Sequence, residues 1–361
     1  MKTKLIVLGA ILGTAALIFI SIFIIKPPKP IIEIKGEALI TLVDNGSEAT
    51  NVVILNTLFT AWVAMALLIA FCFFAIRKRS MVPSGIYNLF EALIEGILSL
   101  VESIGGKEHA RKFFPLVATF FIYIAFANWL SLTPLFNTIG VYEPVTAEEH
   151  EFHKHAVVFK DSGLISFGAK SLEFDDKECT TLPADQLEAC REKVIEEETK
   201  GSVKEGEKYG VLAPYLRGIN TDLMTPLSFA LVSAFFVEMW GITTLGFFRY
   251  AGKFLNFKGG PIGFFVGILE FVAELGRLIS FSFRLFGNMM AGEILLLVMT
   301  FLVAVASPIM VIFYGLEMFV GGIQAFVFGT LTLVFGVLAV SAHDEGHDDH
   351  AHGHGEAEAH H

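Results

Sequence analysis

Residues 261–342 form one long apolar stretch that carries only six charged side chains. A membrane-spanning helix needs about 20 apolar residues, so this stretch is far too long for a single pass. Pro308 is the strongest candidate for a break, because proline lacks a backbone N–H and its ring clashes with the preceding turn of a helix. The stretch therefore predicts two long helices that fold back on each other as a hairpin within a membrane.

Four further apolar runs have spanning length: Leu5–Ile25, Ile54–Ile76, Phe113–Phe136 and Leu223–Phe248. Arg77-Lys78-Arg79 follows the second run and predicts a cytoplasmic end there. The first run fits either a signal peptide or an uncleaved anchor, and the lack of a small-residue cleavage site favours the anchor. We expect an all-α polytopic membrane protein with about four spanning helices besides the hairpin.

The segment Ile86–Ile104 differs from these runs because its apolar residues recur at helical spacing, with Glu91 and Glu95 on the other face. Gly105-Gly106 ends the pattern. This amphipathic helix either lies along the membrane surface or packs on its own protein, and the sequence leaves both placements open.

Charge divides the chain into parts. Residues 142–210 hold 17 acidic and 9 basic side chains, and residues 343–361 hold six acidic side chains, seven histidines and no Lys or Arg. The 54% hydrophobic content excludes a disordered chain, a disulfide-rich secreted domain and a nucleic-acid binder. We expect the following organisation: an anchor and outer linker (1–50), two spans flanking the amphipathic helix (51–136), an acidic soluble excursion on the outer side (137–222), a span plus the hairpin (223–342) and a His-rich disordered tail (343–361).

The sequence leaves two further questions open. Cys179 and Cys190 both lie in the acidic excursion, where a disulfide is one alternative. The histidines of the tail are compatible with metal binding, but the Gly-, Ala- and Asp-rich composition around them is typical of a solvated end. No metal site is assigned.

The charges of the hairpin are the candidate functional groups, since a charge at bilayer depth costs at least ~2.5–3.5 kcal/mol. At 100° per residue, Arg277 and Arg284 share a helix face with Glu270, whereas Glu293 lies half a revolution from Arg284. On the same first helix, Asn288 lies one turn beyond Arg284. On the second helix, Glu317 and Gln324 share a face. Carboxylates that exchange protons, beside one arginine that never does, are what a proton path needs.

Structural explanations compete at some positions. Glu274 and Arg277 are three residues apart and can simply pair, and Glu238, alone in its span, can be a satisfied polar residue. Arg284 has no acidic residue three or four positions away, so a purely structural role is hard to justify for it.

The segment Ser280-Phe-Ser-Phe-Arg284-Leu-Phe-Gly-Asn288-Met-Met-Ala-Gly-Glu293, followed by Gln324-Ala-Phe-Val-Phe, resembles the a subunit of F-type ATP synthases. The resemblance covers roughly 51–136 and 220–342 in layout. It implies that Arg284 is the essential charge facing the c-ring carboxylate, with Asn288 and Gln324 as polar neighbours. It also implies that Glu293 and Glu317 line an outer half-channel, where the family often has one histidine.

The same resemblance implies that Glu270 lies on the cytoplasmic path. Asn220-Thr-Asp222-Leu-Met-Thr resembles the family's approach to the next span, which implies that Asp222 lies at the outer mouth. The first apolar run, the long excursion and the His-rich tail depart from the family's common pattern.

The resemblance further implies that the chain is a non-catalytic stator subunit of a protein complex in a bacterial plasma membrane. Its partners would be the c-ring, b-type peripheral stalk subunits, the remaining ATP synthase subunits and lipid, with no nucleic acid. No cofactor is expected, and no Gly-rich nucleotide loop is present, so ATP chemistry belongs to other subunits. The C-terminal tail is predicted in the cytoplasm, and protons rather than Na⁺ are the default ion.

Two alternatives belong to other functional classes. A self-contained ion-coupled secondary transporter would be expected to show inverted repeats, and none is evident. A purely structural membrane anchor is disfavoured by the six charges of the hairpin.

Overall fold

The computed structural model describes the chain as a multi-pass helical membrane protein. Five helices in the described part of the chain are long and apolar enough to cross a membrane. The expected fold class is confirmed. The strands of the structure lie in the segment before α2 (Asn56–Arg77) and in the segment between α3 (Ile86–Ser131) and α5 (Met224–Leu245). The described residues are 38–43, 52–77, 85–133, 136–137, 139–143, 145, 155–160, 168–174, 179, 184–203, 207–247, 250, 252, 260–303 and 308–341.

A short hairpin precedes the first described helix. Strands β1 (Ala38–Val43) and β2 (Val52–Leu55) pair antiparallel, and α2 (Asn56–Arg77) begins directly after them. The prediction that a span begins at Ile54 was therefore wrong by two residues. Val52-Val-Ile-Leu55 is as apolar as the helix that follows, but its β-branched residues suit a paired strand.

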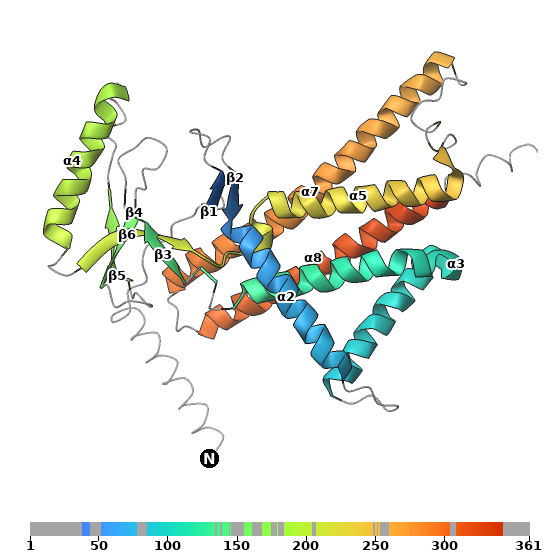
Figure 1. Cartoon of the computed structure of the whole chain (residues 1–361), viewed down its shortest axis with the longest axis horizontal. Coiled ribbons are helices and arrows are strands. Elements are labelled where there is room, and N and C mark those ends of the chain that lie inside the picture. Colours follow the sequence, from blue (N-terminus) through green and yellow to red (C-terminus); the bar gives the residue numbers. More distant parts are fainter. Residues whose placement is uncertain are drawn as a thin grey trace, which may run out of the picture. The chain divides into compact units, whose positions relative to one another are not determined.

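Helix α3 (Ile86–Ser131) contains one non-helical residue, Gly106, with φ 69° and ψ 158°. This conformation is essentially reserved for glycine, so the helix turns sharply there (Figure 1). The predicted break at Gly105-Gly106 is confirmed. The predicted span Phe113–Phe136 was misplaced, because the second limb is already helical after Gly106 and ends at Ser131.

The remaining long helices follow the predicted pattern. Helix α5 (Met224–Leu245) lies within the predicted run Leu223–Phe248 and is shorter by one residue at its start and three at its end. Helices α7 (Gly260–Val303) and α8 (Pro308–Ser341) correspond to the predicted hairpin. Pro308 is the first residue of α8, where its missing N–H costs no helical hydrogen bond.

The described residues form two compact units. The first unit comprises the described residues within Met1–Leu68, Phe126–Thr225 and Phe286–Gly322, and the second comprises those within Ile69–Ala125, Pro226–Leu285 and Ile323–His361. Long helices contribute to both units, because the division falls within α2, α3, α5, α7 and α8.

The second unit has an aromatic core. Phe113 of α3 and Trp240 of α5 lie with ring centroids 4.5 Å apart, and Leu333 of α8 is fully buried in the same cluster. Ile97 and Val101, from the first limb of α3, pack into this core. The amphipathic helix therefore packs on its own protein through the later part of its apolar face.

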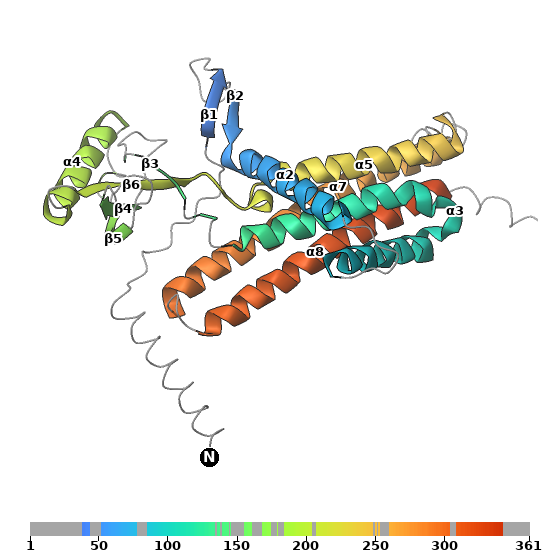
Figure 2. The same cartoon turned by 60° about the horizontal axis from the view of Figure 1, so that its bottom comes forward.

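The acidic excursion folds into a small domain in the first unit, which we call the excursion domain. Strands β3 (Gly140–Glu143), β4 (His155–Lys160), β5 (Gly168–Glu173) and β6 (Glu207–Pro214) form an antiparallel sheet in the order β3-β6-β4-β5. Helix α4 (Ala184–Ser202) lies beside the sheet (Figures 1 and 2) and contributes Ile195 to a core with Ala156, Val158, Leu172 and Phe174.

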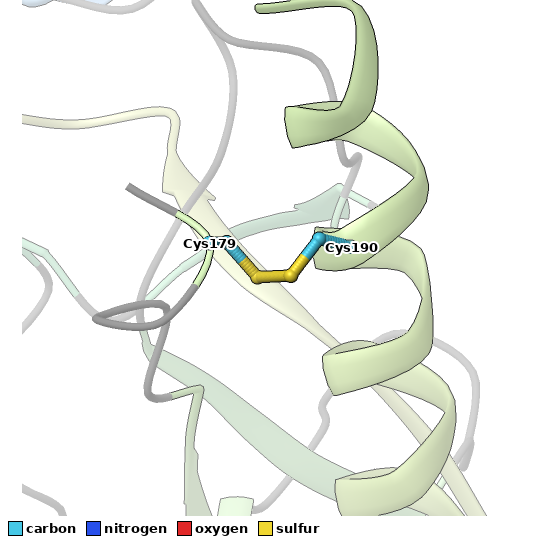
Figure 3. Close-up of a disulfide and its surroundings, with 2 residues drawn as sticks. All are labelled: Cys179 and Cys190. Carbon is cyan, nitrogen blue, oxygen red and sulfur yellow. A yellow bond between two sulfur atoms is a disulfide. The ribbon is translucent and has the colours of Figure 1, made fainter. Parts of the chain in front are cut away.

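A disulfide joins Cys179 to Cys190 within this domain (Figure 3). The two Cα atoms lie 5.6 Å apart, and Cys190 belongs to α4. The alternative left open by the sequence is therefore settled in favour of the bridge. The predicted anchor Leu5–Ile25 and the His-rich tail 343–361 lie outside the described residues.

Candidate functional site

Arg284 lies on an exposed face of α7. Its neighbours Phe281 and Leu285 are buried, and Phe281 packs against Phe328 and Phe335 of α8 with centroid distances of 5.3 and 5.5 Å. These contacts hold one face of α7 against α8, while the Arg284 side chain is exposed. It forms no ion pair with any residue that the structure describes. No carboxylate in the described part of the chain therefore neutralises this cation.

The first unit contains a polar cavity with about 430 Å³ of empty space, part of it open to solvent. It brings together Glu293 of α7 and Glu317 of α8, the two carboxylates that were predicted to share one half-channel. Its other lining residues come from the end of α3, the segments around the excursion domain and α7: Asn128, Ser131, Asn137, Gly218, Asn220, Thr221 and Met289.

The two oxygens of Glu293 have different surroundings. Oε1 accepts a hydrogen bond of 2.6 Å from Nδ2 of Asn137. Oε2 is buried and has no hydrogen-bond partner among the described residues. It lies near Gly218, at which a Cβ atom would come within 3.6 Å of it. One oxygen is thus held by an amide, and the other is buried without a hydrogen-bond partner among the described residues.

Glu317 is 8% exposed and lies against α7. Its carboxylate occupies the space that a Cβ atom on Gly292 would fill, so only glycine fits there without a shift. Because Gly292 directly precedes Glu293, this close approach places the two acidic residues at one point of the helix pair.

A network of side-chain hydrogen bonds extends from the cavity residues Asn128 and Asn220. Asn220 Nδ2 donates to Asn128 Oδ1 at 2.6 Å, and Asn128 Nδ2 donates to the Gly321 carbonyl at 3.2 Å. Nε1 of Trp129 donates to the Met318 carbonyl at 2.9 Å. These bonds join the end of α3 to α8 and to the segment before α5. Asn128 was not predicted as a site residue, although a polar residue inside an apolar run is a usable signal.

Asp222 is not among the residues that line the cavity. Its Oδ1 accepts a hydrogen bond of 3.1 Å from the backbone N–H of Met224, the first residue of α5. Its Oδ2 accepts from Thr57 Oγ1 of α2 at 3.0 Å. The carboxylate therefore satisfies an N–H at the start of α5 and ties that helix to α2.

A second group of ionisable side chains lies in the second unit. Arg277 forms an ion pair with Glu274, as expected if the two residues have a structural role. The Arg277 guanidinium lies 4.7 Å from the centre of the Phe335 ring. Glu238 of α5 is hydrogen-bonded to Tyr250, whose ring lies so close to Gly241 that a Cβ there would overlap it. Burial, followed by the hydrogen bond to Glu238, raises the pKa of Tyr250, so the phenol remains a donor.

The structure places the other predicted residues as follows. Gln324 is 3% exposed, Asn288 and Ser280 are exposed, and Glu270 is half-buried. Asn288, Gln324 and Glu270 each have interactions within the chain.

Five apolar helices with ionisable side chains along them, an exposed arginine and a cavity with two carboxylates define a polytopic membrane protein equipped to handle ions. The family model described as ATP synthase A chain matches residues 58–336, and the chain belongs to this family. It is similar to ATP synthase subunit a of Helicobacter pylori (strain Shi470), with 29% identity over 246 residues, 66% of this chain and 72% of the relative. It is also similar to ATP synthase subunit a of Gloeobacter violaceus, with 30% identity over 254 residues, 70% of this chain and 72% of that protein.

Membership of this family makes the chain a non-catalytic, membrane-sector subunit of an F-type ATP synthase. The chain thus takes part in ATP synthesis and proton transport, as an integral membrane protein and in association with other subunits of the complex. The resemblance recognised in the Arg284 segment is confirmed at the level of the family.

Proposed function

We propose that the chain forms two offset proton half-channels that meet a c-ring carboxylate at Arg284. The observation that carries this proposal is the exposure of Arg284, which forms no ion pair with the described residues. An arginine in lipid without a partner is expensive, so a carboxylate from another subunit is the partner that its chemistry demands. Asn288 and Gln324 serve as its polar neighbours.

Glu293 and Glu317 carry protons in the half-channel that opens to the outer side. The cavity that contains them is polar, has room for water and is partly open to solvent, which supports this assignment. Asp222 holds the start of α5 beside α2 at this end.

Glu270 belongs to the half-channel that opens to the cytoplasm. Glu238, which is hydrogen-bonded to Tyr250, adds a carboxyl group that can exchange protons, and Tyr250 interacts electrostatically with Glu274 and Arg277. Because Glu274 neutralises Arg277, this pair leaves Arg284 as the fixed charge of the path.

The mechanism follows from electrostatics. A ring carboxylate must be neutral to move through lipid, because a charge there costs several kcal/mol. Beside Arg284 the carboxylate is favoured, so it releases its proton to one half-channel and takes another from the second after nearly a full turn. The same guanidinium repels a proton that would cross directly between the half-channels. The membrane potential supplies about 2.3 kcal/mol per charge per 100 mV.

The same scheme fixes a topology. The excursion within 137–222 lies on the outer side of a bacterial inner membrane, and the His-rich tail 343–361 lies in the cytoplasm. The disulfide Cys179–Cys190 supports the outer placement, because disulfides persist in oxidising compartments. The c-ring and the b-type peripheral stalk are the direct partners of the membrane helices.

Arg284 provides the test of this function. In inverted vesicles, Arg284→Ala is expected to abolish ATP-driven proton pumping while the complex remains assembled, and Arg284→Lys is expected to fail or nearly fail. A lysine ammonium is a compact charge that can lose its proton at this depth, whereas a guanidinium cannot. Pumping is measured by quenching of a ΔpH dye, beside a blot for assembled catalytic subunits. Arg277→Lys is the matched control, because it keeps the charge beside Glu274, and it should pump. Normal pumping by assembled Arg284→Ala complexes would exclude the proposed role.

A further inference from the structure

The excursion domain is joined to the cavity by two hydrogen-bonded segments. Strands β3 and β6 pair from Glu143↔Val211 to Gly140↔Pro214. The pairing continues beyond the strands, because the Tyr215 N–H donates to the Ile139 carbonyl at 2.9 Å. We call the paired segments 139–143 and 211–216 the root ribbon.

Asn137 lies at the cavity end of the root ribbon. Its backbone N–H donates to the Leu216 carbonyl at 2.9 Å, and its φ is 56°. This left-handed conformation is uncommon for residues other than glycine, asparagine and aspartate. The ribbon therefore holds Asn137 in a conformation that most side chains would disfavour.

Both strands of the ribbon lead to one carboxylate. The Asn137 amide donates to Oε1 of Glu293 at 2.6 Å, and Gly218, two residues after Leu216, lies beside Oε2. Oε2 is buried and has no hydrogen-bond partner among the described residues. A carboxylate whose Oε1 accepts an amide N–H is left with Oε2 as the oxygen that can take a proton.

We propose that Asn137 is a positioning residue, held by the root ribbon of the excursion domain, which orients Glu293 so that Oε2 receives the proton. This inference rests on the proposed place of Glu293 in the outer half-channel. It gives the excursion domain a part in proton uptake: the domain's root fixes the geometry of a carboxylate in the path.

The test uses complexes reconstituted in liposomes, with ATP synthesis measured while the pH on the excursion-domain side is varied. Asn137→Gly removes the amide and leaves the left-handed conformation accessible, so backbone strain does not contribute. The lost N–H no longer stabilises the charged carboxylate, and we expect the pH of half-maximal rate to rise by about one unit, equal to roughly 1.4 kcal/mol. Asn137→Asp places a second negative charge beside Glu293 and should raise this midpoint further.

Thr133→Ala is the matched control. It removes a hydrogen bond from the same connection, Thr133 Oγ1 to the Leu130 carbonyl at 2.8 Å, and should keep the original pH profile. An unchanged midpoint in assembled Asn137→Gly and Asn137→Asp complexes overturns the inference. Glu293→Gln, measured in parallel, separates the two proposals: if it retains the original profile, the place of Glu293 in the path is wrong. If Glu293→Gln loses synthesis while both Asn137 variants behave as the original protein, only the role of Asn137 fails.

Discussion

Gly292 is the position at which the smallest possible change should disturb proton transfer most directly. It lies on α7 where the carboxylate of Glu317 approaches from α8, and a Cβ atom would overlap that carboxylate. Gly292→Ala therefore forces the Glu317 side chain to move, because the added methyl group cannot leave the helix. The affected atoms are those that carry the proton in the proposed half-channel.

The size of the effect follows from packing. Inserting a methyl group into a filled site costs roughly 1–3 kcal/mol. If this cost falls on the proton-carrying geometry, a factor of ten per about 1.4 kcal/mol gives a loss of roughly 5- to 150-fold in rate. We expect assembly to be kept, since the atoms that must move are the far end of a flexible side chain.

The assay is ATP-driven quenching of a ΔpH dye in inverted vesicles, normalised to assembled complex. Glu317→Asp shortens the side chain by one methylene, so the double variant Gly292→Ala/Glu317→Asp should pump faster than Gly292→Ala alone. Gly315→Ala is the control, because nothing lies within 4 Å of a Cβ at that position of α8. Full activity of Gly292→Ala, or strictly additive losses in the double variant, would refute the contact as a determinant of flux.

The membrane helices could be predicted because their signal is local. Apolar runs of spanning length, the break at Gly105-Gly106 and the break at Pro308 each act on a few neighbouring residues. The predicted helix boundaries were less accurate where composition does not distinguish a helix from a strand. The run Val52–Leu55 is apolar in a strand as it would be in a helix, and only its pairing with Ala38–Val43 decides between them.

The site could be predicted in part. Glu293 and Glu317 were assigned together, and the structure places both on one cavity. Asn137 could not be found, because its contact with Glu293 depends on the pairing of two segments separated by the whole excursion domain. The spacing of Cys179 and Cys190 likewise left their bridge open, since a spacing of 11 residues fits both free and bonded cysteines.

The remaining predictions test the parts of the chain away from Glu293. Cys179→Ala/Cys190→Ala should make the excursion domain more sensitive to protease, because a bridge closing a loop of this length contributes about 3 kcal/mol to its stability. In intact spheroplasts that carry the original protein, a membrane-impermeant reductant followed by an impermeant maleimide should add mass at both cysteines. Labelling only after lysis would contradict the outer placement of the excursion domain. Tyr250→Phe should slow pumping while the complex stays assembled, because it removes the hydroxyl bonded to Glu238 and keeps the ring packed beside Gly241. A buried acceptor that loses its donor costs about 1–3 kcal/mol, so Glu238 must find another hydrogen-bond partner. Gly241→Ala, which displaces the whole ring, should cause a larger loss in the same dye-quenching assay. Original pumping rates in both variants would remove the Glu238–Tyr250 pair from the cytoplasmic path and leave that path to Glu270.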